Sequence, residues 1–246
     1  AGGMLGGGCA LELAKYGTRL ALIDIDSVKL ETMVNKCQSA GLGPDRIVSV
    51  VGDVTKVEDA QRVVQEAVKA FGKVTNVINI VGIKRLGNLE TCTIEDLDVA
   101  LNGCVRSTFI VCKEAIPELI KTKGAIVNMS SVSGIRAYHY GLPYGTAKAA
   151  VNHMTRIMAS GLAKHQVRVN AVAPSLAKPA DPSLITTAME KGYGIASRAI
   201  PFGRVGENYE VVKTILYLSS ASAGFITGAI LPIDGAYCQT LYEPPN

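Results

Sequence analysis

The sequence predicts a single α/β domain, residues 1–246, built on a doubly wound parallel sheet. Short β-branched runs alternate with helix-patterned segments, and the chain opens on a glycine-rich loop. Hydrophobic residues make up 48% of the 246 positions, which is enough for a large core. No repeat, linker or low-complexity tract divides the chain.

The predicted elements follow from these patterns. Five β-branched runs predict buried strands over residues 19–24, 46–51, 76–80, 125–129 and 167–172. Apolar residues at helical spacing predict helices over residues 8–16, 28–40, 57–71, 94–120, 144–162 and 209–219. A doubly wound sheet needs a strand before its first glycine loop, and this loop starts at Ala1. We therefore expect the first strand to come from residues upstream of Ala1.

Charge and cysteine usage restrict the classes of function. The 25 Lys and Arg residues exceed the 21 Asp and Glu residues by 4, and these charges are scattered, so nucleic-acid binding is not expected. The 6 cysteines form no CxxC pair and do not cluster with the 3 histidines. The pattern therefore predicts no metal site and no disulfide framework, and it favours a reducing, cytoplasmic compartment. No apolar stretch is long enough to cross a membrane, so we expect a soluble protein.

Three glycines, Gly2, Gly6 and Gly8, stand just before and at the start of the first predicted helix. Without side chains they allow the phosphate oxygens of a dinucleotide to reach backbone N–H groups at a helix N-terminus. The pattern predicts a cofactor loop in a Rossmann-like fold. A tight strand-to-helix turn is the alternative interpretation.

Asp24 ends the next predicted strand, about 20 residues after this loop, where a carboxylate can accept hydrogen bonds from the adenosine ribose. The same charge would repel a 2′-phosphate, and no arginine is adjacent, so NAD is favoured over NADP. Asp26 would be the contacting acid if the strand ran longer. Asp26 or Ser27 is also expected to cap the following helix.

Tyr144 and Lys148 are spaced to share one face of a predicted helix. The lysine charge is expected to lower the pKa of Tyr144 towards working pH, so that Tyr144 can remove an alcohol proton. A core tyrosine beside a solvated lysine is the alternative. Ser131 follows a predicted strand and is expected to hold a carbonyl oxygen, whereas Ser130 and Ser133 are expected to serve the turn.

In this order, the motifs resemble the short-chain dehydrogenase/reductase family over essentially the whole chain. The loop and strand-end matches are Gly2, Gly6 and Gly8 with its TGxxxGxG loop, Asp53-Val54 with its adenine-contacting pair, and Asn79 and Gly82 with the ends of its NNAG segment. The later matches are Ser131, Tyr144 and Lys148 with its catalytic positions, residues 169–174 with the strand ending at the proline of its PG motif, and Asp234-Gly235 with its C-terminal DG.

The resemblance implies hydride transfer between a secondary alcohol and the nicotinamide of NAD, with a ketone as the other partner. Ser131 would orient the substrate oxygen, Tyr144 would exchange its proton, and Lys148 would hold the ribose and tune Tyr144. The implied cofactor contacts also include Asp53, Val54, Asn79, Gly82 and Pro174. A homo-oligomer, tetramer or dimer, is also implied, with the helices over 94–120 and 144–162 at its interface.

Several positions depart from the family pattern: Ala1, Ile80, Val81, Ser175 and Pro179. The helix asparagine that completes the family's catalytic group falls on Cys104, whose thiol is a weak hydrogen-bonding group. Asn102 would replace it only if a local bulge rotated the helix. These changes keep a second interpretation open, in which NAD binds to a non-redox lyase, cyclase or regulatory module.

Residues 175–201 are expected to form a substrate loop. The apolar side chains expected at the pocket are Leu184, Ile185, Met189 and Tyr193 in that loop, with Tyr138 and Tyr140 before the catalytic tyrosine. They favour a small, largely apolar alcohol or ketone. His139 is expected to be a surface loop residue.

Overall fold

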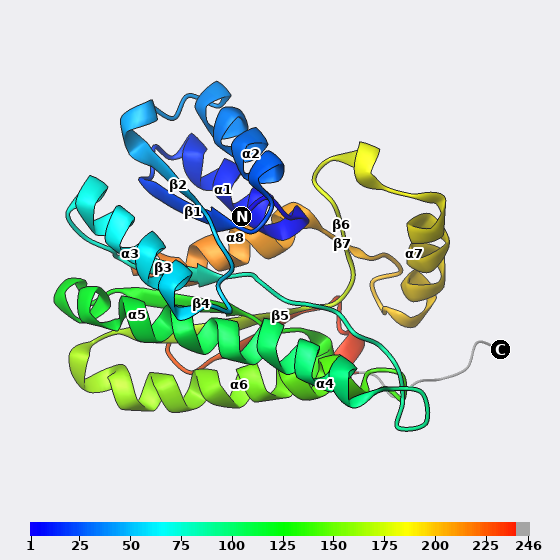
Figure 1. Ribbon diagram of the computed structural model, residues 1–246. Helices are drawn as coiled ribbons and strands as arrows, with labels where there is room; N and C mark the ends of the chain where they lie inside the picture. The colour runs from blue at the N-terminus through cyan, green and yellow to red at the C-terminus, as the bar shows by residue number, and fades with distance from the viewer. Residues whose placement is uncertain (240–246) are drawn as a thin grey trace.

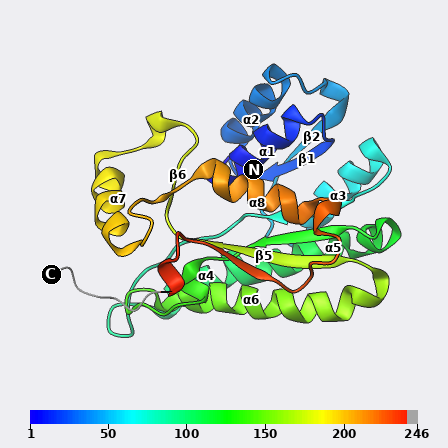
Figure 2. The same cartoon turned by 180° about the vertical axis from the view of Figure 1, so that it is seen from behind.

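The computed structural model describes residues 1–239 and has a layered α/β fold with helices on both faces of central parallel strands (Figures 1 and 2). The central strands are β1 (Leu20–Asp24), β2 (Ile47–Val51), β3 (Asn76–Asn79), β4 (Ala125–Met129), β5 (Arg168–Pro174) and β8 (Ile230–Ile233). A short parallel pair, β6 (Ala177–Lys178) and β7 (Gly206–Glu207), lies near α7. The predicted Rossmann-like α/β fold and single domain are confirmed.

The hydrogen bonds divide the central strands into two sheets. β1 pairs with β2, and β3, β4, β5 and β8 form a second sheet in that order, and the strands in each of these pairs are parallel. All five predicted strands are present, with ends that differ by no more than two residues. β8 was not predicted, because its short run contains Pro232, which cannot donate to a ladder.

Helix α1 (Met4–Lys15) begins four residues before the predicted start. Gly6 and Gly8 therefore lie inside the helix, and only residues 1–3 remain as a loop. A Cβ on Gly8 would collide with the side-chain oxygen of Asn208, the first residue of α8 (Asn208–Ser219). Gly8 thus allows α1 and α8 to pack closely.

The helix predicted over 94–120 is interrupted. It consists of α4 (Ile94–Leu101), a π-helical turn (Asn102–Arg106) and α5 (Ser107–Thr122). Inside this region the hydroxyls of Ser107 and Thr108 donate to the carbonyls of Gly103 and Cys104, at 2.7 and 2.8 Å. The apolar periodicity continues through the turn, so the sequence pattern does not reveal it.

The other predicted helices are present as α2 (Ser27–Ser39), α3 (Val57–Phe71), α6 (Leu142–Leu162) and α8. α6 starts two residues early because Pro143 fits the first turn of a helix. α7 (Thr187–Ala199) lies within the predicted substrate loop and was not predicted. It stands apart from the sheets, on the right of Figure 1.

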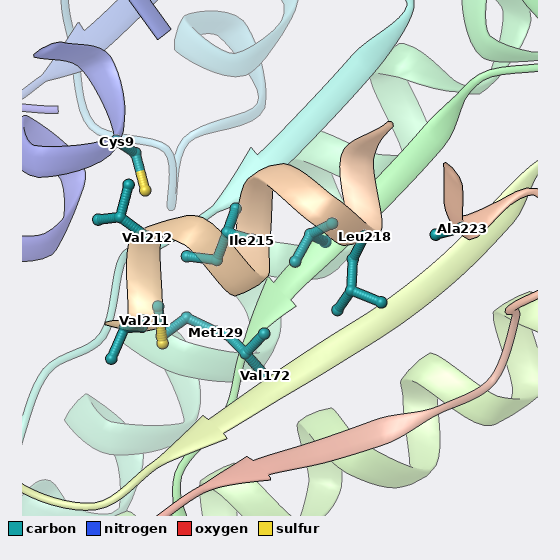
Figure 3. Close-up of a cluster of buried hydrophobic side chains, with 9 residues drawn as sticks. Cys9, Met129, Val172, Val211, Val212, Ile215, Leu218 and Ala223 are labelled. Carbon is teal, nitrogen blue, oxygen red and sulfur yellow. The ribbon is translucent and has the colours of Figure 1, made fainter. Parts of the chain in front are cut away.

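The core holds the carboxyl ends of β4 and β5 in place. On one face α8 packs on these strands, and its Val211, Ile215 and Leu218 belong to one buried cluster with Met129 and Val172 (Figure 3). The opposite faces of the same strands pack against α5 and α6. Strands buried on both faces have continuous apolar runs in their sequence, and such runs predicted β4 and β5.

In residues 1–239, no helix combines the length and apolar character needed to span a bilayer.

Candidate active site

Ser131, Tyr144 and Lys148 converge at the carboxyl end of β4. Ser131 follows the strand, while Tyr144 and Lys148 occupy the first two turns of α6. The Lys148 Nζ lies 5.6 Å from the centre of the Tyr144 ring, and Tyr144 also hydrogen-bonds with Ser131. The structure thus brings the three predicted catalytic side chains together.

The Lys148 ammonium is buried, with 1% of the residue exposed. Its Nζ donates to the Met129 carbonyl at 2.7 Å, so the last residue of β4 fixes the end of the side chain. Gly82 lies against it, because a Cβ there would sit 3.0 Å from Nζ. Burial lowers the pKa of Lys148, and the nearby Cys104 opposes this shift.

The expected lowering of the Tyr144 pKa is wrong. Burial raises the pKa of Tyr144 to about 12, and the neighbouring Cys104 adds to the rise while the hydrogen bond with Ser131 opposes it. The physical reason is that Lys148 hydrogen-bonds to a backbone carbonyl, so its charge does not outweigh desolvation of the phenolate. Tyr144 is therefore a neutral phenol at physiological pH.

Ser131 also serves the local turn, contrary to the division of roles expected from the sequence. Its Oγ accepts the Ser133 backbone N–H at 3.2 Å, which caps the 3-10 turn Val132–Gly134. Ser130 donates instead to the Lys148 carbonyl at 3.3 Å. The Ser131 hydroxyl also donates to the Ser133 hydroxyl at 3.3 Å, so two bonds with Ser133 hold the Ser131 oxygen in position.

A π-helical bulge is present at Asn102–Arg106, but it does not bring Asn102 to the site. Asn102 is exposed, whereas Cys104 is completely buried, and its thiol lies 3.8 Å from the Ile83 carbonyl. Cys104 is close enough to Lys148 and Tyr144 to affect the pKa of both. A thiol therefore occupies the position that the family resemblance gives to an asparagine.

The N-terminus of α1 fits an anionic group. Its N-cap, Gly3, offers no side-chain cap, the first turn holds no acid, and a Cβ on Gly3 would meet no atom within 4 Å. Free backbone N–H groups and open space are what a pyrophosphate requires. The residues present therefore fit the phosphates of a dinucleotide.

Asp24 lies beside this loop at the end of β1. Its carboxylate accepts the backbone N–H groups of Gly2 and Asp26, at 2.7 and 3.0 Å. Asp26 caps α2 by accepting the Lys29 N–H at 3.0 Å and pairs with the Lys29 ammonium at 2.8 Å, which confirms the capping role expected for it. Of the two acids, Asp24 is the one in contact with the glycine loop.

The remaining predicted cofactor residues have varied surroundings. Asp53 accepts the Thr55 N–H at 2.9 Å, and Val54 is buried. Gly82 lies beside Lys148, and Pro174 ends β5, opposite Ile233. Their contacts with a cofactor stay predictions.

Asn79 belongs to a buried polar network that the sequence analysis missed. Its amide donates to the Asn128 carbonyl oxygen at 2.9 Å, and Asn128 donates to the Thr155 hydroxyl at 3.0 Å. The network joins β3, β4 and α6. An asparagine inside the apolar run of β4 was the available signal, because a buried amide needs partners.

The expected pocket side chains differ in exposure. Tyr138, Tyr140 and Leu184 are exposed, whereas Ile185, Met189 and Tyr193 are half-buried. Tyr138 is near enough to Tyr144 to influence its pKa. His139 is exposed, as expected. In the described part of the chain, no cluster of His, Cys, Asp and Glu side chains is arranged to hold a metal ion.

Comparison with known proteins agrees with this fold. The family described as enoyl-(acyl carrier protein) reductase matches residues 3–237. The chain belongs to the short-chain dehydrogenase/reductase family of oxidoreductases.

Particular relatives are similar over nearly their whole length. A 3-oxoacyl-[acyl-carrier-protein] reductase of Thermotoga maritima is 34% identical, with 94% of this chain and 92% of the relative covered. A trans-4-hydroxycyclohexanecarboxylate dehydrogenase of Sinomonas cyclohexanicum is 30% identical, with coverage of 94% and 87%.

Two solved structures share the fold closely. A short-chain dehydrogenase/reductase of Caenorhabditis elegans, solved with cofactor, has a TM-score of 0.88, 26% identity and coverage of 96% and 92%. ElxO with NADP bound has a TM-score of 0.86, 28% identity and coverage of 94% and 93%.

Because Tyr144 is buried, we predict that its phenol ionises at a higher pH than that of a solvated tyrosine. An ultraviolet difference titration of the protein against its Tyr144→Phe variant should show the lost phenol ionising near pH 12, above the value of about 10 for a solvated tyrosine. A lost titration at or below that solvated value would mean that Lys148 controls the phenol after all.

Proposed function

We propose that this protein is an NAD-dependent oxidoreductase that interconverts a secondary alcohol and a ketone. The convergence of Ser131, Tyr144 and Lys148 beside Gly82 carries the proposal. The names of two relatives, a 3-oxoacyl reductase and a hydroxy-acid dehydrogenase, support chemistry at a carbinol or carbonyl carbon. The proposed substrate is a small, largely apolar molecule, and the pocket is formed with residues 175–201.

Each side chain has a distinct part in this proposal. Bound NAD supplies the ring that accepts or returns the hydride. Ser131 donates to the substrate oxygen in place of the Ser133 hydroxyl and holds that oxygen near Tyr144. Tyr144 then gives a proton to that oxygen in reduction, or takes one in oxidation. Lys148 holds the cofactor ribose, and the Met129 carbonyl restrains its ammonium.

The raised pKa of Tyr144 supports reduction as the easier direction at neutral pH, because a neutral phenol is ready to donate. Oxidation needs the phenolate, whose fraction grows tenfold per pH unit below the pKa. Burial of the phenol therefore biases the proposed site towards the ketone as substrate.

NAD is the proposed cofactor because Asp24 places a negative charge beside the glycine loop. ElxO, a solved relative, holds NADP, so the cofactor choice needs its own test.

We also propose that the protein is a homo-oligomer, either a tetramer or a dimer, in the cytoplasm. The exposed Ile94, Phe109 and Ile157 support an interface formed by the helices around the site.

The first test follows NADH across a panel of secondary alcohols and the matching ketones. The unmodified protein should turn over at least one pair, with oxidation rising with pH from 7 to 9 and reduction level, because of the pKa of about 12. Tyr144→Phe should lower the rate by about a hundredfold or more, since it removes only the proton-transferring hydroxyl. Binding of NAD without turnover of any pair would favour the non-redox interpretation.

Cofactor choice gives a second prediction. The unmodified protein should prefer NAD to NADP by about tenfold or more in kcat/KM, and Asp24→Asn should reduce that preference because the charge that repels the 2′-phosphate is gone. Asp26→Asn is the matched control, since asparagine caps a helix equally well. A shift in the Asp26 variant alone would identify Asp26 as the discriminating acid.

Cys104 gives a third prediction. If the thiol limits proton delivery behind Lys148, then Cys104→Asn, which adds an amide donor and acceptor, should raise kcat by about threefold or more. Cys104→Ala should not raise kcat. Thermal unfolding of both variants checks that the buried site still packs. An unchanged kcat in the asparagine variant would show that Cys104 does not limit the reaction.

A further inference from the structure

The C-terminal turn, defined here as residues 234–239, contacts two segments around the proposed site, and the strand before it contacts a third. It follows β8, whose last residue, Ile233, accepts the N–H of Ser175 at 3.1 Å, at the start of the substrate loop. A Cβ on Gly235 would lie 2.8 Å from the Ile200 side chain and 3.1 Å from that of Phe202, at the loop's other end. Figure 2 shows the red turn beside the base of the segment that carries α7.

The turn has an internal scaffold. The Asp234 carboxylate accepts the N–H groups of Ala236 and Cys238, at 3.0 and 2.8 Å. Gly235 and Ala236 both have positive φ, 58° and 72°, and Ala236 carries the steric strain of that region because it has a Cβ.

Arg136 supplies the third contact, from the catalytic side. It lies five residues after Ser131, and its Nη1 donates to the Tyr237 carbonyl at 2.8 Å. Its guanidinium also lies over the Tyr237 ring, 5.3 Å from the centroid. A planar guanidinium can donate and stack at once, which a lysine cannot do in the same way.

We infer that Arg136 is a positioning residue that clasps the C-terminal turn to the loop behind Ser131, and that this clasp fixes both ends of the substrate loop. The start of the loop is tied to Ile233, just before the turn, and its end packs on Gly235, while Arg136 holds the turn at Tyr237. The pocket geometry near α7 then depends on a side chain of the catalytic loop. The inference rests on the proposed function for its effect on turnover.

Hydrogen exchange of the full chain tests the clasp without any substrate. In Arg136→Ala, the amides of Ser175, Tyr237 and Cys238 should exchange about fivefold faster or more, while those of β4 and β5 stay unchanged. Arg136→Lys keeps the charge, and its exchange rates should lie between those of the unmodified protein and of Arg136→Ala. This second variant keeps the test valid if the alanine variant folds poorly. Arg46→Ala, at an exposed arginine far along the chain, is the control for the lost charge.

Kinetics on the alcohol or ketone turned over by the unmodified protein supplies the second readout. Arg136→Ala should raise KM by about tenfold, with kcat and the NAD dissociation constant changed by less than about twofold, because the loop that encloses the substrate is loosened. If hydrogen exchange at Ser175 and in the turn is unchanged, the proposed role of Arg136 is wrong, even if KM rises. If no substrate is turned over at all, the proposed function is wrong. The hydrogen-exchange result then tests the role of Arg136 by itself.

Discussion

The buried ammonium of Lys148 is the constraint on which the site depends. A charge inside a protein is tolerated only when its hydrogen-bonding groups are met, and here the end of β4 supplies the Met129 carbonyl. The backbone of α6 must therefore lie close to the strand. Gly134 makes this possible, because a Cβ there would lie 2.6 Å from the Lys148 carbonyl carbon. The positions of Ser131 and Tyr144 follow from this close approach.

Buried side-chain hydrogen bonds fix the orientation of the elements that form the site, and apolar packing supplies the free energy that holds them together. The Asn79, Asn128 and Thr155 bonds fix how β3, β4 and α6 meet, because each buried amide would be destabilising by about 1–3 kcal/mol without its partner. The contacts of α8 with β4 and β5 supply the hydrophobic free energy but specify orientation less strictly. Both sets of contacts hold β4, whose last residue, Met129, binds the Lys148 ammonium.

The sequence predicted the parts of the fold that have a simple period. The buried runs of β4 and β5 and the amphipathic α3 were located correctly because their burial is regular along the element. α7 was missed because Gly192 and Gly194 lower its helix propensity and no residue of it is buried. The grouping of Ser131, Tyr144 and Lys148 followed from motifs, but the Tyr144 pKa did not. A spacing of four residues places two side chains on one face and says nothing of the burial that opposes ionisation.

The π-helical turn shows how one local change decides which side chain reaches the site. A π turn adds one residue to a helical turn, so every later side chain is rotated by about 100° relative to a continuous α-helix. In this chain the turn directs Cys104 inward against Gly82 and Lys148 and leaves Asn102 in solvent. A regular helix through residues 94–120 could not keep both the outer face of α4 and the buried face of α5 in their observed places. The bulge is therefore part of the architecture, and it decides that the side chain facing the lysine is a thiol.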